Sequence, residues 1–362
     1  MQTILFYFDA DCGGTRGGSE NVLKQIYRYY AAQGDVIYVL FQKQKEFGGW
    51  DNIPDKGTYL LYGGSLKSII FNLWHLRKIE FDLAYSTFAN YTGMLGLLKR
   101  VGILKIHRLI GRESTPIFDR YRGLNLKLRK LVYMLGYPAV DTVVCQTGYM
   151  RDRLITNLPW ISQKSRVIVV PNPIDLNQAV VQSLESDKDI NRFCPYIVTA
   201  GRFIKEKAYD VLLPSFKKLL ENYPQLTLII LGEGPLKDQV VKQIEELALQ
   251  NKVILYGFAD NVFPFFKKAR LCVISSRIEG FPNVLLQMMT QNDKVVSTLC
   301  ADGIDKINGL FTCQPDDVDG LYEAMRLCLE DNTDDCRNKF DIELQRRSIN
   351  SFISKIENSF IN

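Results

Sequence analysis

The stretch YIVTAGRFIKEKAYDVLL, residues 196–213, decides the fold of the second half of this chain. It begins as a continuous apolar run, which is typical of a strand buried on both faces of a parallel sheet. The run ends at Gly201, and the pattern after it predicts a helix from about Ala208. Arg202 and Lys207 therefore flank a turn at the carboxyl end of a strand, where open α/β sheets bind their ligands.

Arg202 and Lys207 allow two interpretations. Two positive charges beside the N-terminus of a helix would bind a diphosphate, because the free amides and the helix dipole there also favour negative charge. The plainer alternative is a pair of solvated side chains in a loop. The residues alone leave both interpretations open.

Outward from this stretch, strand-like runs alternate with helical patterns along the whole chain. The runs are continuously apolar, and examples are TILFYF, KIHRLIG, TVVCQ, LTLIIL and LCVISS. Helical periodicity predicts helices over 19–30, 66–78, 209–221, 236–250 and 318–329. This alternation predicts repeated βαβ units and therefore an α/β fold with parallel sheets.

The length and the breaks in the pattern predict two domains. A chain of 362 residues is long for a single hydrophobic core. The sequence PNP at 171–173 stops the last strand of the first half, and the stretch after it is polar. We expect one domain over 1–175 and a second over 176–340, with 341–362 forming a C-terminal helix that packs back on the first domain.

The composition indicates a globular, cytoplasmic protein. The apolar fraction is 46% and the charged fraction 23%, which are ordinary values. No run approaches the ~20 apolar residues that span a bilayer, and the first run is too short for a signal peptide. The eight cysteines form no CxxC pair, so we expect reduced thiols rather than a zinc site.

The charge is distributed unevenly. Residues 1–175 hold 23 Lys and Arg against 14 Asp and Glu, whereas 176–362 hold 22 against 26. A basic first half suggests an anionic partner there. The segment 118–138 combines Leu and Tyr with five basic residues, so it could contact an anionic membrane. The alternative is a core-packing helix with one solvated basic face.

A second cluster lies in ISSRIEGFPNVLLQMM, residues 274–289. A strand is predicted to end in the loop formed by Glu279, Gly280, Phe281 and Pro282. A helix then begins near Asn283, with proline pre-organised at its start. The free amides of Phe281, Asn283 and Val284 would face an anion, and Glu279 could accept hydrogen bonds from sugar hydroxyls. The alternative is an ordinary helix-entry loop with a capping carboxylate.

Two glycine-rich turns follow other predicted strands. In LGEGPL, Gly232 and Gly234 allow a close approach of backbone, but Lys237 stands where a dinucleotide fingerprint needs a third glycine. The loop before the first predicted helix contains Gly17 and Gly18. The spacing of the glycines in this loop matches neither a dinucleotide fingerprint nor a P-loop. A metal site at the aspartates preceding this loop is not expected.

Taken together and in order, these motifs resemble the retaining glycosyltransferases of family 4. The matching stretches are GGSENVL, VVPNPID, GRFIKEK, LGEGPL and EGFPNVLLQMM. The resemblance covers nearly the whole chain. It implies the GT-B fold, in which two Rossmann-like domains with parallel sheets face each other across a cleft, the first binding the acceptor and the second the donor.

The resemblance also implies roles for residues. Arg202 and Lys207 would neutralise the diphosphate of a nucleotide sugar, with a UDP-sugar favoured, and Glu279 would hold the sugar hydroxyls. The loop at Gly17 and Gly18 would approach donor phosphate and acceptor. The acceptor would be a glycan or lipid-linked saccharide in bacterial surface-polysaccharide assembly. The family pattern implies no metal, no other cofactor and no nucleic-acid partner.

The chain departs from the family pattern at two donor-side positions. Gln287 replaces the second glutamate of the family's E-x7-E pair, which usually binds ribose, and Ala208 replaces a glycine. On the acceptor side, Glu113 aligns with the family's usual histidine, between Arg112 and Ser114. Glu113 could orient or deprotonate the acceptor hydroxyl, or simply pair with Arg112 or a neighbouring lysine.

Other classes of protein remain possible from the sequence alone. A dinucleotide-dependent α/β enzyme would need a complete GxGxxG, which neither glycine cluster supplies. A nucleic-acid-binding protein would need basic and aromatic residues on one surface and no organised diphosphate site. A relative weakened in catalysis is compatible with Gln287.

Overall fold

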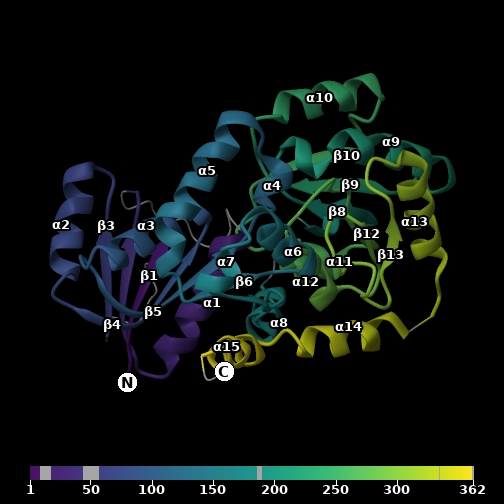
Figure 1. Cartoon of the computed structure of the whole chain (residues 1–362). Coiled ribbons are helices and arrows are strands. Elements are labelled where there is room, and N and C mark those ends of the chain that lie inside the picture. The colour runs from purple at the N-terminus through teal and green to yellow at the C-terminus, as the bar shows by residue number, and fades with distance from the viewer. Residues whose placement is uncertain (9–17, 44–56, 186–189, 334, 361–362) are drawn as a thin grey trace. The chain divides into compact units, whose positions relative to one another are not determined.

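The structure is a computed structural model that describes residues 1–8, 18–43, 57–185, 190–333 and 335–360. The chain divides into two compact units, each an α/β domain with a parallel sheet, as the sequence predicts (Figure 1).

Unit 1 comprises Met1–Pro173 and Ile349–Asn362, and unit 2 comprises Ile174–Ser348. The division after Pro173 lies close to the boundary expected after residue 175. The C-terminal part is divided differently from the expectation, because α14 (Asp335–Gln345) belongs to unit 2 and only α15 (Ile349–Asn358) belongs to unit 1.

Unit 1 is built on a seven-stranded sheet with the order β3-β2-β1-β4-β5-β6-β7, in which every neighbouring pair is parallel. Its strands are β1 (Thr3–Phe8), β2 (Val36–Phe41), β3 (Thr58–Tyr62), β4 (Glu80–Thr87), β5 (Lys105–Glu113), β6 (Thr142–Cys145) and β7 (Arg166–Val169). Its described helices are α1 (Gly18–Ala32), α2 (Leu66–Leu76), α3 (Ala89–Arg100), α4 (Ile117–Arg120), α5 (Gly123–Gly136), η1 (Tyr137–Ala139), α6 (Gly148–Asn157), α7 (Ile161–Lys164) and α15.

The helices of unit 1 cover both faces of its sheet. Alternate strand residues point to opposite faces. Leu5 and Tyr7 join one core with α2, α3 and α5, whereas Ile4 and Phe6 join another with α1 and α15. The helices α3 and α5 pack very closely, because a Cβ on Gly136 would lie 1.9 Å from the backbone oxygen of Gly93.

Unit 2 is built on a six-stranded parallel sheet with the order β10-β9-β8-β11-β12-β13. Its strands are β8 (Tyr196–Ala200), β9 (Thr227–Leu231), β10 (Val253–Gly257), β11 (Leu271–Ile274), β12 (Val295–Thr298) and β13 (Phe311–Cys313). Its described helices are α8 (Leu176–Ser183), η2 (Ile190–Phe193), η3 (Lys205–Lys207), α9 (Tyr209–Asn222), α10 (Lys237–Glu246), α11 (Phe263–Lys268), α12 (Asn283–Gln291), α13 (Val318–Glu330) and α14. The central strands are almost entirely buried, in keeping with their continuous apolar sequences.

Among the described residues, no helix is both long enough and apolar enough to cross a membrane.

Candidate functional site

The carboxyl ends of three neighbouring strands in unit 2 carry most of the predicted site residues. The strand β8 leads into Gly201 and Arg202, β9 leads into Gly232, and β11 leads into the loop that holds Glu279. Parallel strands end at the same edge of their sheet, so these turns are neighbours. The structure therefore brings together the clusters that the sequence places far apart.

An ion pair joins two of these turns. The Nζ of Lys207 lies 2.6 Å from Oε1 of Glu279, and both side chains are about four-fifths buried. The hydroxyl of Ser276 donates to the same carboxylate oxygen at 2.9 Å. Arg202 is exposed, and its side chain makes no hydrogen bond or ion pair with the described residues. One cation is thus fixed at the edge of the sheet and a second is free to meet an anion.

The turn that carries Lys207 is held by hydrogen bonds from side-chain hydroxyls to backbone oxygens. Ala208 is the N-cap of α9 and has φ +51°, a left-handed conformation that favours glycine. The hydroxyl of Tyr209 donates to the backbone oxygen of Gly201, and Ser275 donates to that of Lys207. Burial raises the pKa of the Tyr209 phenol. These bonds hold the turn between β8 and α9 in one conformation.

Arg277 braces this turn, a role that the sequence does not reveal. Its guanidinium contacts Asp210 at 2.6 Å and Asp316 at 2.5 Å, and donates to the backbone oxygen of Lys205 at 2.7 Å. The hydrogen bond from Arg277 lowers the pKa of Asp210. Only the fold unites these four positions, and the one signal in the sequence is an arginine three residues after the end of a buried strand.

Close backbone contacts join the turns after β8 and β9. A Cβ on Gly232, which has φ +146°, would lie 2.1 Å from the backbone oxygen of Gly201. A Cβ on Gly234 would lie 2.6 Å from the amide nitrogen of Phe203. The glycines of LGEGPL therefore serve the packing of one turn against the other.

The loop before α12 presents the start of a helix to the same edge. Pro282 is the N-cap and supplies no side-chain cap, so the first-turn amides at Asn283 and Val284 are not capped in that way. Gly280 is half-buried, and Phe281 is buried in the core of unit 2. Gln287, one turn into the helix, is partly exposed.

In unit 1, Glu113 ends β5 as predicted, but its side chain is buried. Its exposed fraction is 4%, and its two carboxylate oxygens accept hydrogen bonds from the hydroxyls of Tyr133 and Tyr137, at 2.6 and 2.5 Å. Burial raises the pKa of Glu113, while the two tyrosines and Arg112 oppose that rise. Direct contact with an acceptor would require the tyrosines to move.

The polar side-chain atoms of the residues next to Glu113 are also buried. Arg112 donates to Oδ1 of Asn172, within the PNP sequence, at 2.5 Å, and burial lowers the pKa of its guanidinium. A guanidinium remains protonated at neutral pH even so. The Oγ of Ser114 is buried and has no hydrogen-bond partner among the described residues. The end of β5 is therefore a dense polar cluster.

Part of the predicted glycine loop lies outside the described residues. This holds for Gly17 and for the two aspartates of the preceding DAD sequence, at 9 and 11, whereas Gly18 begins α1. In the described part of the chain, no group of three or more His, Cys, Asp or Glu side chains could hold a metal ion.

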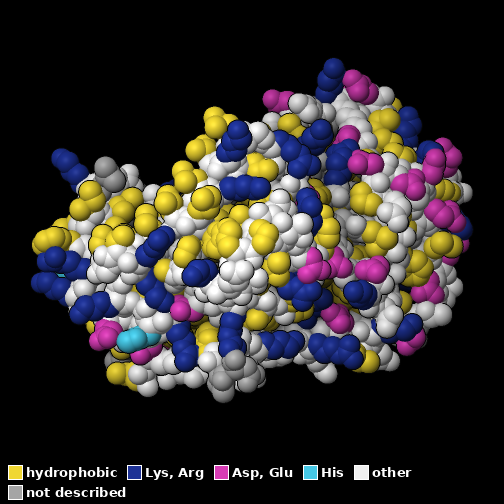
Figure 2. Space-filling model, viewed as in Figure 1, with side chains coloured by type: hydrophobic (Ala, Val, Ile, Leu, Met, Phe, Trp, Pro, Cys, Tyr) yellow, Lys and Arg dark blue, Asp and Glu magenta, His cyan; other side chains and the backbone are white. Residues whose placement is uncertain are grey.

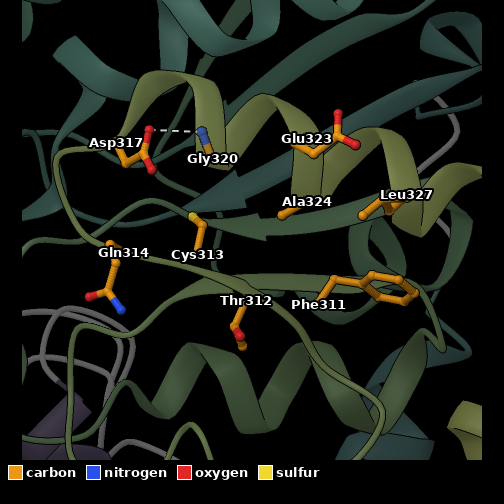
Figure 3. Close-up of a pocket in the computed structure, with 9 residues that line it drawn as sticks. All are labelled: Phe311, Thr312, Cys313, Gln314, Asp317, Gly320, Glu323, Ala324 and Leu327. Atoms are coloured by element: carbon orange, nitrogen blue, oxygen red, sulfur yellow. Dashed lines mark hydrogen bonds between the residues drawn. The ribbon is translucent and has the colours of Figure 1, made fainter.

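A pocket of about 310 Å³ lies between β13 and α13, at the edge of the unit 2 sheet (Figure 3). Asp317 caps α13 there by accepting a hydrogen bond from the amide of Gly320 at 2.8 Å. The nine described residues that line the pocket include Asp317 and Glu323 but no Lys or Arg. The pocket is therefore poorly suited to a diphosphate.

Sequence families match both units. Residues 16–178 match the family described as Glycosyltransferase Family 4, and residues 194–331 match the one described as Glycosyl transferases group 1. Together the matches cover most of the chain. The chain belongs to the family 4, group 1 glycosyltransferases.

Three proteins illustrate the relationships of this glycosyltransferase. An uncharacterized glycosyltransferase of Methanocaldococcus jannaschii is 34% identical over 53% of this chain and 48% of its own length, so the match spans about half of that relative. A Campylobacter jejuni N-acetylgalactosaminyltransferase that acts on a diphospho-undecaprenol saccharide is 28% identical over 71% of this chain and 69% of its own. A lipopolysaccharide core glycosyltransferase of Rhizobium meliloti is 27% identical over 61% and 64%.

Solved structures share the fold. The structure of Anabaena HepE in complex with UDP-glucose superposes with a TM-score of 0.79 over 99% of both chains, at 17% identity. A sucrose-phosphate synthase of Thermosynechococcus elongatus superposes with a TM-score of 0.75, over 99% of this glycosyltransferase and 98% of that chain, at 15% identity. The two parallel-sheet domains are thus those of GT-B glycosyltransferases.

Proposed function

We propose that this chain is a retaining glycosyltransferase that moves a hexose or hexose derivative from a nucleoside-diphosphate sugar to a glycan or lipid-linked saccharide, in polysaccharide assembly. The observation that carries the proposal is the grouping of Arg202, Lys207 and Glu279 with the start of α12 at the carboxyl edge of the unit 2 sheet. A UDP-sugar is favoured, since HepE, which shares the fold, was solved with UDP-glucose.

In the proposed reaction, the bond between the anomeric carbon and the oxygen of the β-phosphate breaks. A new bond forms between that carbon and the acceptor hydroxyl oxygen, on the same face of the sugar. The hydroxyl proton passes to the departing phosphate, so the products are a nucleoside diphosphate and the glycosylated acceptor. Such a reaction needs no protein nucleophile.

The donor would be bound by complementary charges. Lys207, held in place by Glu279, and the exposed Arg202 would neutralise the diphosphate as negative charge develops on it. The first-turn amides of α12 would add hydrogen bonds to the same anion. Glu279 would accept hydrogen bonds from the sugar hydroxyls, and Gln287 would accept one from ribose. The two cations and the first-turn amides of α12 would neutralise the charge on the diphosphate, which a bound metal ion neutralises in other transferases.

For the acceptor side we infer a positioning role for Glu113. Its carboxylate holds Tyr133 and Tyr137, which belong to α5 and η1, against the end of β5. Arg112 and Ser114 lie on either side of it in the chain, and Gly18 begins the helix after the expected acceptor loop. The hydrogen bonds of Glu113 would hold the end of β5 in one conformation, and the acceptor hydroxyl would lie beside it.

We further propose that the protein binds peripherally to the cytoplasmic face of the membrane. The segment 118–138 comprises most of α4, all of α5 and the start of η1, and its basic residues would contact anionic lipid there. A lipid-linked acceptor, as named for the Campylobacter relative, would be presented at such a surface.

A thermal-shift screen tests the proposal. The purified protein is heated with UDP, GDP, ADP, NAD and common UDP-sugars, with and without EDTA. We expect one nucleoside diphosphate to raise the melting temperature equally in both conditions. A rise with NAD alone would favour a dinucleotide enzyme, and no rise with any nucleotide would contradict the donor site. A rise without sugar transfer would indicate a relative that binds but has lost catalysis.

Matched variants locate the site. Arg202→Ala and Lys207→Ala should each lower turnover by about 100-fold or more, because each removes charge stabilisation of the leaving group. Arg270→Ala, at the opposite end of β11, and Lys217→Ala, on the exposed face of α9, are controls that should keep full activity. Wild-type rates in both site variants would refute the diphosphate assignment.

A further inference from the structure

Three helices of unit 1 expose large apolar side chains to solvent. On α2 these are Ile70, Phe71 and Trp74, the last two with 63% and 57% of their surface exposed. On and after α3 they are Leu97, Val101 and Ile103. On α5 they are Leu124, Leu128, Leu131, Met134 and Leu135, with Leu124 71% exposed. Single exposed apolar residues are normal, but a gathering of this size marks an interaction surface.

The three helices lie on one face of the same sheet. Their inward sides, represented by Leu76 of α2, Leu95 of α3 and Tyr133 of α5, share a single core cluster. The close contact of Gly93 with Gly136 joins α3 directly to α5. The outward sides of α2, α3 and α5 therefore belong to one layer, which we call the helical layer.

The helical layer is positively charged. None of the three helices contains Asp or Glu. The helices and the residues that follow them directly carry Lys67, Arg77, Lys78, Lys99, Arg100, Lys127, Arg129 and Lys130. Figure 2 shows yellow and dark blue side chains gathered over these helices, with magenta confined mainly to the lower edge of unit 1.

Two acidic groups near these helices contact basic side chains of other elements. Asp119 contacts Arg153 at 2.6 Å, and Glu80 contacts His107 at 3.1 Å. Of the basic residues in the helical layer, Lys99 contacts an acid, Asp141, at 2.5 Å. Arg77 instead lies over the ring of Trp74, with its guanidinium carbon 3.2 Å from the ring centroid.

We propose that the helical layer lies on the surface of an anionic lipid bilayer. In this proposal α2 contacts the lipid directly, as α5 does. Exposed Trp, Phe and Leu side chains would enter the boundary between headgroups and acyl chains, while Lys and Arg would remain among anionic headgroups. The stack of Arg77 on Trp74 unites both functions in one pair. Nucleic acid would be bound through the cations but would leave the aliphatic side chains in water. The proposed lipid-binding surface includes α2 and α3, which lie outside the segment 118–138.

Vesicle binding tests the proposal on the full-length protein. Sedimentation with phosphatidylglycerol vesicles should deplete the protein, and phosphatidylcholine vesicles should deplete it much less. Raising the salt concentration should weaken binding without abolishing it, because the apolar contacts are not screened. Equal binding to both lipids, or no binding to phosphatidylglycerol, would overturn the proposal.

Paired variants separate α2 from α5. Phe71→Ser with Trp74→Ser should weaken binding to phosphatidylglycerol on the order of tenfold, and Lys127→Glu with Lys130→Glu should weaken it at least as much. The control is Val181→Ser with Ile342→Ser, which removes equally exposed apolar side chains from unit 2 and should change nothing. An unchanged affinity in the α2 variant would overturn the assignment of α2.

A spectroscopic measurement keeps the test independent of folding defects. Lipids brominated in the acyl chain should quench tryptophan fluorescence of the wild type, and Trp74→Phe should remove most of that quenching. Undiminished quenching in Trp74→Phe would contradict insertion of α2. Sugar transfer to a soluble acceptor, measured without vesicles, reports on the proposed function separately, so either proposal can fail alone.

Discussion

The guanidinium of Arg347 lies over the ring of Phe281, 4.5 Å from its centroid. Arg347 is buried, its Nε lies 2.7 Å from a carboxylate oxygen of Glu343, and its backbone oxygen accepts a hydrogen bond from Ile174 at 2.9 Å. Ile174 is the first residue of unit 2 and Arg347 is nearly the last. Arg347 thus joins the two ends of the unit to the loop that precedes α12.

We expect Arg347→Lys to raise the KM for the sugar donor by about three- to tenfold with little change in kcat, because the planar stack on Phe281 is lost while the charge remains. Steady-state kinetics at varied donor concentration measure this. Glu343→Gln is the control, since it retains an acceptor for Arg347 and leaves the stack in place. A lower melting temperature without a change in KM would assign Arg347 a purely structural role.

Gly232→Ala should destabilise the protein by about 2–4 kcal/mol, because the new Cβ would meet the backbone oxygen of Gly201. Gly303→Ala separates sterics from backbone conformation, since Gly303 also has positive φ but no atom within 4 Å of an added Cβ. It should lose about 1 kcal/mol. Urea unfolding measures both, and equal losses would show that the close approach is not the cause.

Gln287→Glu should tighten binding of the nucleoside diphosphate by about three- to tenfold if residue 287 contacts ribose, because a carboxylate accepts hydrogen bonds more strongly than an amide. Gln239→Glu adds the same charge on the exposed side of α10 and is the control. Calorimetric titration gives the two dissociation constants. An unchanged constant in Gln287→Glu would place ribose elsewhere.

The pH dependence of stability should report on Glu113. Burial raises its pKa in the folded protein, so the folded state holds its proton to a higher pH than the unfolded state does. The stability it contributes is present at low pH and is lost as the pH rises above the ordinary carboxyl range.

Glu113→Gln should therefore cost less stability at higher pH than at lower pH, relative to the wild type, in urea unfolding at several pH values. The substituted amide retains one acceptor for Tyr133 or Tyr137, so most activity should survive if Glu113 only positions its neighbours. A loss of turnover beyond about 100-fold in a stable variant would favour direct action on the acceptor hydroxyl.

The sequence predicts the elements of this fold well because burial on both faces leaves a strong local signal. The prediction of a helix over 209–221 corresponds to α9 (Tyr209–Asn222), and that over 318–329 corresponds to α13 (Val318–Glu330). The prediction over 236–250 is too long, because α10 ends at Glu246 and Ala248 has φ +56°. A residue in the left-handed conformation ends a helix. Because alanine normally favours the helix, the sequence does not predict that the helix ends before Ala248.

The contacts that organise the candidate site could not be predicted, because each joins residues from distant elements. Arg277 meets Asp210 and Asp316 only once β11, α9 and the turn before α13 are folded together. The tyrosines that hold Glu113 follow it by 20 and 24 residues and are typical core residues by sequence. Local patterns specify which residues end strands, whereas partner choice depends on the packed fold.

The return of α15 to unit 1 makes unit 2 a continuous insertion within a discontinuous domain. Unit 1 needs both ends of the chain, since Phe352, Ile353 and Ile356 of α15 lie in the same core as the first strand. Unit 2 is bounded by two junctions, after Pro173 and after Ser348, and its ends are joined by the hydrogen bond from Ile174 to Arg347. Chimeras between relatives should therefore exchange 174–348 as one cassette, whereas a single crossover in the middle of the chain would separate α15 from its own core.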